Sequence, residues 1–277
     1  MTLTDTGFIE VDGARLEYRM IGPRPDAAPT IVMLHEGLGS VGLWGDFPDR
    51  IAGATGAGVF VYSRAGYGRS SKGKLPRSTR FMHEEACNVL PHVLDAIGFQ
   101  RGFLLGHSDG ASIAAIYAGS VQDHRVRGLV LEAPHFFTEE MGVAEIARAR
   151  EAFISGTFRE KLGRWHDDVD CAFRSWSEPW TDPEFRKWDI TDALAYIRVP
   201  ILIVQGDQDQ YGTLRQLDVA KEECFCPVET AVLPGIRHVP HRQAPELTIK
   251  IIADFIHRLL HDHQEGEPQP ESGVAAV

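Results

Sequence analysis

The sequence has few cysteines, no excess of positive charge and no long apolar run, and each of these absences excludes a class of protein. Cysteine occurs 4 times in 277 residues, at scattered positions, which is too sparse for the disulfide framework of a small secreted domain. No run approaches the roughly 18 apolar residues that a membrane-spanning helix needs. The formal net charge of −11 disfavours binding to nucleic acid or to an anionic membrane, because both would be repelled.

The start of the chain and its histidines and cysteines give no sign of targeting or of a metal site. Residues 1–8 have no basic region followed by an apolar stretch, so we expect a cytoplasmic protein. Cys224-Phe225-Cys226 is not a C-x-x-C pair, and the acids after His166 lack a paired histidine at ligand spacing. We therefore expect no metal, no cofactor and a small molecule as the partner, while self-association stays open.

Apolar runs alternate with helical segments along most of the chain. Each run is short and almost continuously apolar, which is typical of parallel strands covered on both faces. The runs are residues 30–34, 58–62, 102–105, 127–131 and 201–205. Before them, residues 8–21 predict a β-hairpin that turns at Asp12-Gly13. The pattern indicates an α/β fold with a doubly wound, mostly parallel sheet.

Ser108 is the first candidate for chemistry. It lies in the pentapeptide Gly106-His107-Ser108-Asp109-Gly110, a G-x-S-x-G pattern between the apolar run 102–105 and the alanine-rich segment 111–118. Alone, this pattern would also fit an ordinary Gly-Ser turn. With a strand before it and a helix after it, it predicts a sharp turn, a nucleophile elbow, whose glycines leave the serine oxygen exposed beside a helix N-terminus.

A serine hydroxyl needs a base, and a carboxylate that orients the base, before it can act as a nucleophile at neutral pH. After the run 201–205, the chain turns through Gly206-Asp207-Gln208-Asp209, which places two carboxylates at the end of a strand. His238 comes after the next strand-like run. His241 competes as the base, although it follows Pro240 at the expected start of a helix, where a surface histidine is common. The order along the chain is Ser, Asp, His.

Together, five motifs resemble those of the alpha/beta-hydrolases, whose triad follows this order. The motifs are Leu34-His35-Glu36-Gly37, the stretch 62–70 around Ser63-Arg64, the pentapeptide at Ser108, the turn 206–209 and the loop that carries His238. The resemblance covers nearly the whole chain and implies an eight-stranded sheet. It also implies a catalytic triad in which Ser108 is the nucleophile, His238 the general base and Asp209 the acid, with Asp207 as the competing acid.

The resemblance further implies an oxyanion hole formed by the backbone N–H groups of Gly37 and Asp109. Here the chain departs from the family, because Glu36 stands where a glycine is usual. One interpretation has the Glu36 side chain turned outward or paired with an arginine such as Arg64. The other makes Glu36 a substrate contact or a proton relay with a raised pKa. Arg64 itself is expected to satisfy loop carbonyl groups.

The alternation of strands and helices stops between residues 135 and 190, where four of the five tryptophans lie. Residues 138–154 have the apolar spacing of an amphipathic helix, and Pro179 and Pro183 are expected to break the later part into short pieces. In the family, an insertion at this position is a helical cap over the active site. The candidate pocket residues are His35, Glu36, Trp165, Trp176, Trp188 and Tyr211.

These observations divide the chain into an alpha/beta-hydrolase core, residues 1–134 and 191–263, and a helical cap insertion, residues 135–190. Residues 264–277 lack apolar periodicity and are predicted to be a disordered tail.

The resemblance implies a carboxylesterase-like serine hydrolase that cleaves a small ester or lactone through an acyl-enzyme on Ser108. One alternative is a C–C bond hydrolase of aromatic ring-cleavage products, in which Arg174 or Arg186 would hold a substrate carboxylate. Haloalkane and epoxide hydrolysis are disfavoured, because those branches use an aspartate where this chain has Ser108. A third possibility, from a different class, is a ligand-binding or receptor-like protein that does not turn over its ligand.

Overall fold

A β-hairpin begins the sheet, and its turn is of the kind that the sequence predicts. In the computed structural model, which describes residues 3–265, strand β1 (Thr6–Val11) pairs antiparallel with β2 (Ala14–Ile21). Asp12 and Gly13 between them have positive φ angles of 51° and 79°. Two successive residues of this kind form a type I′ turn, whose twist suits a hairpin. The predicted hairpin is confirmed.

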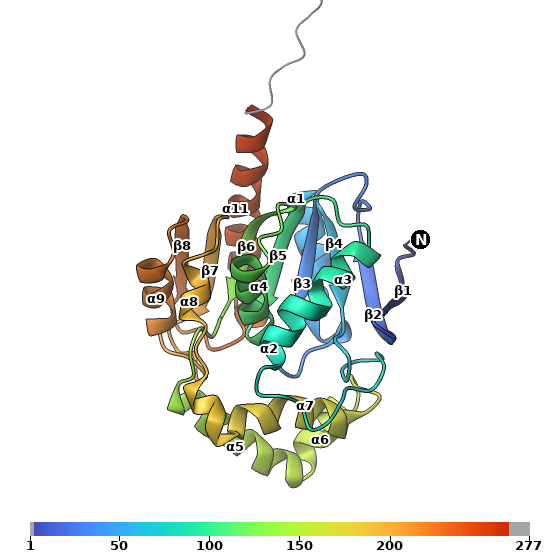
Figure 1. Cartoon of the computed structure of the whole chain (residues 1–277), viewed down its shortest axis with the longest axis vertical. Helices are drawn as coiled ribbons and strands as arrows, with labels where there is room; N and C mark the ends of the chain where they lie inside the picture. The colour runs from blue at the N-terminus through green and yellow to red at the C-terminus, as the bar shows by residue number, and fades with distance from the viewer. Residues whose placement is uncertain (1–2, 266–277) are drawn as a thin grey trace, which may run out of the picture.

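The sheet has eight strands in the order β1-β2-β4-β3-β5-β6-β7-β8 (Figure 1). β2 pairs antiparallel with β4, and all pairs from β4 to β8 are parallel. The six parallel strands are β3 (Thr30–Leu34), β4 (Gly58–Tyr62), β5 (Gly102–His107), β6 (Val126–Glu132), β7 (Ile201–Gly206) and β8 (Val228–Leu233). The predicted doubly wound, mostly parallel sheet is confirmed.

Helices cover both faces of the sheet (Figure 1). One face carries α1 (Phe47–Thr55) and α11 (Pro245–Glu265), which share an apolar cluster with the strands. The other carries α2 (Phe81–Glu84), α3 (Leu90–Ala96), α4 (Asp109–Ser120), α8 (Thr191–Leu194) and α9 (Arg215–Glu223), over a larger cluster. Short elements join them: η1 (Gly42–Trp44), the π-helix η2 (Glu85–Val89), η3 (Pro183–Lys187) and α10 (Pro240–Gln243). Because α4 is buried almost throughout, the residue at its start is rigidly placed.

Three further helices lie together beyond the carboxyl ends of the parallel strands (Figure 1). They are α5 (Glu140–Ile154), α6 (Thr157–Leu162) and α7 (Val169–Thr181), called the α5–α7 segment below. The chain leaves the sheet after β6 and returns before α8. Phe137 and Asp189 pair there in an isolated antiparallel bridge. The segment that leaves the sheet and the segment that returns to it are therefore neighbours.

One helix of this segment agrees with the boundaries predicted from the sequence, and another differs from them. α5 coincides with the amphipathic helix predicted over residues 138–154, and Val143 and Ile146 form its buried side. Pro179, in contrast, does not break the chain into short pieces, because α7 continues through it to Thr181. Only two helical residues follow Pro179, so the missing N–H affects no more than the last turn. Pro183 does start a new element, η3.

The last helix is longer than the sequence suggests. α11 continues to Glu265 and therefore includes residues 264 and 265 of the predicted tail. No glycine or proline interrupts it after Pro245 until Gly266, the first residue that favours a helix end. The rest of the predicted tail, residues 266–277, lies outside the described residues. Within residues 3–265, no helix has the length and apolar character needed to cross a bilayer.

Candidate active site

The turn between β5 and α4 holds Ser108 in a strained backbone conformation. Its φ of 54° and ψ of −118° are values that residues with side chains rarely adopt. The Ser108 N–H donates to the carbonyl oxygen of Glu132 on β6, at 2.9 Å. A Cβ at Gly106 would overlap the backbone of Gly110, and one at Gly110 would overlap the carbonyl oxygen of Leu34. Close packing therefore requires both glycines.

Ser108, His238 and Asp209 are in contact in that order. Ser108 Oγ lies 2.9 Å from His238 Nε2, and His238 Nδ1 lies 2.9 Å from both carboxylate oxygens of Asp209. All three residues are buried. Since an ionised carboxylate can only accept, Nδ1 carries the ring proton and Nε2 is free to accept the hydroxyl proton of Ser108.

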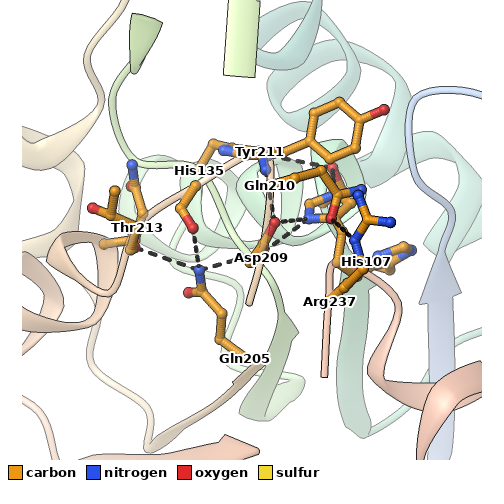
Figure 2. A network of polar contacts seen from close by, with 12 residues as sticks. His107, His135, Gln205, Asp209, Gln210, Tyr211, Thr213 and Arg237 are labelled. Atoms are coloured by element: carbon orange, nitrogen blue, oxygen red, sulfur yellow. Dashed lines mark hydrogen bonds and ion pairs between the residues drawn. The ribbon is translucent and has the colours of Figure 1, made fainter. Parts of the chain in front are cut away.

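The turn after β7 holds the Asp209 carboxylate, as Figure 2 shows. Oδ1 accepts from the Tyr211 N–H at 2.9 Å, and Oδ2 accepts from the Gln205 amide at 3.3 Å. Burial favours a higher pKa for Asp209, but the His238 imidazole and the Tyr211 N–H outweigh it and lower the pKa. Asp207, the competing acid, accepts from the Gly235 N–H at 2.7 Å on the exposed side of the turn. The structure thus brings Asp209 to His238, and not Asp207.

The two backbone N–H groups expected to bind an oxyanion belong to residues that border the cavity around Ser108. These residues are Gly37 and Asp109. Asp109 is the first residue of α4, where an N–H has no acceptor within its own helix. Trp176 of α7 lies directly against Gly37, and a Cβ at position 37 would overlap the indole ring. The α5–α7 segment therefore packs onto the loop after β3 at a position that only glycine fits.

Arg64 fixes the loop after β3. Its guanidinium donates to the carbonyl oxygens of His35 at 2.6 Å and Glu36 at 3.0 Å, and its backbone N–H donates to His35 Nε2. The expected structural role of Arg64 is confirmed. His35 is fully buried and does not line the cavity, although it was a candidate pocket residue.

Glu36 is paired with His107 rather than with an arginine. Its carboxylate lies 3.6 Å from His107 Nδ1, an ion contact longer than a hydrogen bond, and its side chain is 28% exposed at the cavity. Burial favours a higher pKa for Glu36, but His107 lowers it far below its usual range. The lowered pKa disfavours Glu36 as a relay with a raised pKa, whereas its place in the cavity lining agrees with a substrate contact. Burial likewise opposes the charged form of His107, but Glu36 and Glu132 raise its pKa.

A second buried pair lies next to the first. His241 Nδ1 is 2.7 Å from the Glu132 carboxylate, and neither side chain is more than 3% exposed. The His241 ring lies 5.0 Å from the ring of His107 and 4.8 Å from that of Trp44. His241 is thus an interior residue of α10 and not a surface histidine. It supports the floor of the site, while His238 reaches Ser108.

The cavity above Ser108 has a volume of about 280 Å³. The α5–α7 segment supplies an apolar wall that consists of Gly142, Ile146, Phe158, Leu162, Trp176 and Trp180. Polar groups lie on the opposite side, from the loops after the strands. An apolar chamber with a few polar groups at one end is typical of a small-molecule site.

The candidate pocket residues separate into two groups. Glu36, Trp176 and Tyr211 line the cavity. Trp165 is 44% exposed and lies against Gly42, outside the cavity lining. Trp188 is buried against the ring of Phe185, at 5.3 Å, and also lies outside the lining. Trp188 belongs to the apolar cluster of the core, whereas Trp165 is exposed.

The structure also shows a cavity residue that the sequence analysis did not single out. His135 lines the cavity, and its Nε2 lies 3.4 Å from Ser108 Oγ. The residue follows β6 by three positions, at the edge of the sheet where the other strands place Ser108 and Asp209. That placement at a strand end is the one signal in the sequence that could have found it.

The side chains around residue 166 have structural partners of their own. His166 Nδ1 accepts from the Gly68 N–H at 2.9 Å, and its Nε2 donates to the Leu38 carbonyl oxygen at 3.0 Å. Asp168 caps α7 by accepting from the Cys171 N–H. This histidine therefore joins the α5–α7 segment to the loops of the core.

The Glu36–His107 pair predicts that stability depends on pH. Because folding raises the pKa of His107, its contribution is complete below about pH 6.5 and is lost as the pH rises through the folded value. We expect Glu36→Gln to lower Tm by roughly 2–8 °C near pH 6 and by much less near pH 9. Thermal unfolding across this range measures the difference.

A matched control is Glu140→Gln, which breaks the exposed ion pair with Arg186. Such a pair contributes about 0–1 kcal/mol, so this variant should follow the wild type at every pH. An effect of Glu36→Gln that stays constant between these pH values would contradict the prediction.

The chain is similar in sequence to known proteins. Residues 31–251 match a family model described as "Alpha/beta hydrolase family". The chain is 30% identical over 115 residues to proline iminopeptidase of Lactobacillus delbrueckii subsp. bulgaricus, which covers 42% of this chain and 39% of that protein. It is 32% identical over 108 residues to epoxide hydrolase B of Mycobacterium tuberculosis, which covers 38% and 29%. The match thus spans well under half the length of either relative.

A solved structure extends the likeness to the whole fold. The enol-lactonase from Burkholderia xenovorans LB400 superposes with a TM-score of 0.72 over 91% of this chain and 100% of that chain. The sequence identity is 19%, so the likeness is one of fold.

Proposed function

Since the chain belongs to the alpha/beta hydrolase family, we propose that it is a serine hydrolase that cleaves a small carboxylic ester or lactone through an acyl-enzyme on Ser108. The observation that carries the proposal is the unbroken contact from Ser108 Oγ through His238 to the Asp209 carboxylate, at the base of an apolar cavity. A base and an orienting carboxylate are what a serine nucleophile requires.

The first half of the reaction forms the acyl-enzyme. Ser108 Oγ attacks the substrate carbonyl carbon while His238 Nε2 takes the hydroxyl proton. Negative charge develops on the carbonyl oxygen, and the N–H groups of Gly37 and Asp109 stabilise it. The intermediate then collapses, and the imidazolium of His238 gives its proton to the departing alkoxide. In the second half, water attacks the acyl carbon with His238 again as the base, and Ser108 is released.

The charge of Glu36 has to be neutralised for this chemistry, because a free carboxylate would oppose an oxyanion nearby. The contact with His107 favours the opposite charge on that ring, because Glu36 raises the pKa of His107. The His107 Nε2 also donates to the carbonyl oxygen of His238 at 2.8 Å. The ring of His107 thus contacts Glu36 on one side and fixes the backbone of the proposed base on the other.

The cavity favours an apolar acyl group of modest size. The wall from the α5–α7 segment offers no charged partner to a substrate; it is formed by Ile146, Phe158, Leu162, Trp176 and Trp180. The volume of the cavity suits a small substrate. The C–C hydrolase alternative needs a cation for a substrate carboxylate. Arg174 pairs with Glu178 at 2.6 Å and Arg186 pairs with Glu140 at 2.9 Å, both on the exposed surface and outside the cavity lining. The lining does include Arg242, an exposed arginine whose guanidinium donates to the Leu43 carbonyl oxygen, so the ester or lactone is preferred only over a substrate carboxylate bound by Arg174 or Arg186.

A substrate panel tests the proposal. We expect turnover of p-nitrophenyl esters with acyl chains of roughly two to six carbons, and a decline for longer chains that exceed the cavity. Two other substrates accompany the panel: an aromatic ring-cleavage product, for the C–C alternative, and proline p-nitroanilide, for the activity in the name of the iminopeptidase relatives. A preference for either of these by kcat/KM would overturn the ester assignment.

A further inference from the structure

Ser108 Oγ lies between two imidazole rings, and the mechanism above uses only one of them. His238 Nε2 is 2.9 Å away, and His135 Nε2 is 3.4 Å away. The centres of the two rings are 5.6 Å apart. Because both rings border the cavity, a small molecule bound at Ser108 would meet both.

The backbone around His135 is held firmly by neighbouring elements. The Ser112 hydroxyl on α4 donates to the His135 carbonyl oxygen at 2.6 Å, and the His135 N–H donates back to the same hydroxyl at 3.2 Å. The next N–H, that of Phe136, donates to the Gln216 side chain at 2.7 Å. The elbow helix and α9 thus fix the position of this residue.

The ring of His135 is confined as well. The Trp180 ring lies 5.1 Å from it in an edge-to-face contact. On its other side, a Cβ at Gly212 would lie 3.5 Å from His135 Nδ1, so the turn after Asp209 is close by. Only 4% of His135 is exposed. A ring held in this way is aimed at Ser108 by its surroundings.

Burial keeps His135 neutral. Loss of solvation, together with the neighbouring His238, lowers the pKa of His135 to about 3. His238 must become positively charged in each half of the reaction, and a second imidazolium beside it would oppose that step. A neutral ring with one N–H and one bare nitrogen can hydrogen-bond without competing for the proton.

We propose that His135 is a second catalytic residue, which binds through Nε2 the water molecule that hydrolyses the acyl-enzyme. The inference rests on the proposed function, because it concerns the second half of that reaction. The attacking oxygen has to lie about 3 Å from the acyl carbon and within hydrogen-bonding distance of His238 Nε2. The acyl carbon is bonded to Ser108 Oγ, so His135 Nε2 lies within reach of that water.

The step balances without another reactant. The water oxygen forms a bond to the acyl carbon, and one water proton passes to His238 Nε2. The tetrahedral intermediate then breaks the bond between the carbon and Ser108 Oγ, and the imidazolium of His238 returns its proton to Oγ. His135 exchanges no proton. It contributes by holding the water in the orientation from which it attacks the acyl carbon.

Three substitutions test this role against simple packing. A glutamine places a polar atom near the position of Nε2, an asparagine places one near Nδ1, and a leucine offers none. With p-nitrophenyl acetate, the burst of p-nitrophenol reports acylation, and mass spectrometry of quenched samples reports decay of the acyl-enzyme. We expect His135→Leu and His135→Asn to slow the decay by roughly 10- to 100-fold, and His135→Gln to recover most of the rate.

The acylation burst should change by less than about threefold in all three variants if the ring acts on water alone. Equal slowing of burst and decay, or equal decay in the glutamine and asparagine variants, would overturn the inference. If leucine prevents folding, the glutamine and asparagine pair still decides. A wild-type protein that forms no acyl-enzyme would instead overturn the proposed function, and this inference with it.

Discussion

Ser108→Ala is expected to lower kcat for p-nitrophenyl acetate by roughly 10⁵- to 10⁶-fold and to abolish labelling by a fluorophosphonate probe. The reason is that Oγ is the one atom that bonds to the acyl group, so the imidazole of His238 has nothing to activate once it is gone. Alanine can keep the backbone conformation of the elbow, since it needs no more room than serine at the same φ of 54°. Turnover by ultraviolet absorbance and labelling by in-gel fluorescence measure the two effects.

The matched control is Ser120→Ala, at the exposed end of the same helix α4. It should leave turnover and labelling unchanged, because position 120 lies three turns from Ser108. A wild-type protein that neither labels nor turns over any ester would favour the ligand-binding, receptor-like alternative. Turnover that survives in Ser108→Ala would show that a different residue is the nucleophile.

Local signals explain why most of the fold could be predicted. The strands are runs of buried apolar residues, and the turn at Asp12-Gly13 and the glycines around Ser108 are each dictated by backbone geometry. Such features depend on residues close in sequence. The sequence places the end of α11 too early, because the absence of a stop signal is weaker evidence than the presence of one.

The features that could not be predicted depend on side chains far apart in the sequence. Glu36 and His107 meet because β3 and β5 are adjacent, and no motif shows that a histidine will neutralise this carboxylate. The ring of His135 reaches Ser108 because Ser112 anchors its backbone and Trp180 limits its space. Such a placement follows from packing.

The tryptophans between residues 135 and 190 show a similar limit. Trp176 of α7 reaches the cavity, while Trp165 before α7 and Trp188 after η3 do not, although all three are tryptophans between residues 135 and 190. Of these three, Trp176 alone lies on a helix, so helical periodicity could place no more than one of them. Periodicity identifies the buried side of a helix such as α5, but it does not tell whether that side meets a cavity or the core.

Asp209→Asn is expected to lower kcat by about 10³- to 10⁴-fold, with little change in fold. The lowered pKa of Asp209 means that the wild-type carboxylate is charged throughout the neutral range, so it stabilises the imidazolium of His238 in both halves of the reaction. Asparagine removes that charge. Its NH₂ group also has to face a donor in either orientation, because Oδ1 accepts from Tyr211 and His238 while Oδ2 accepts from Gln205.

Asp207→Asn is the control that separates the two carboxylates of this turn. The Asp207 carboxylate accepts one hydrogen bond from the Gly235 N–H, and asparagine can accept the same bond through its carbonyl oxygen. We therefore expect kcat within about threefold of the wild type. Steady-state kinetics of both variants, with circular dichroism to check folding, measure the contrast. A large loss in Asp207→Asn with a small one in Asp209→Asn would reverse the assignment, since only the carboxylate that orients His238 can have an effect of that size on the chemical step.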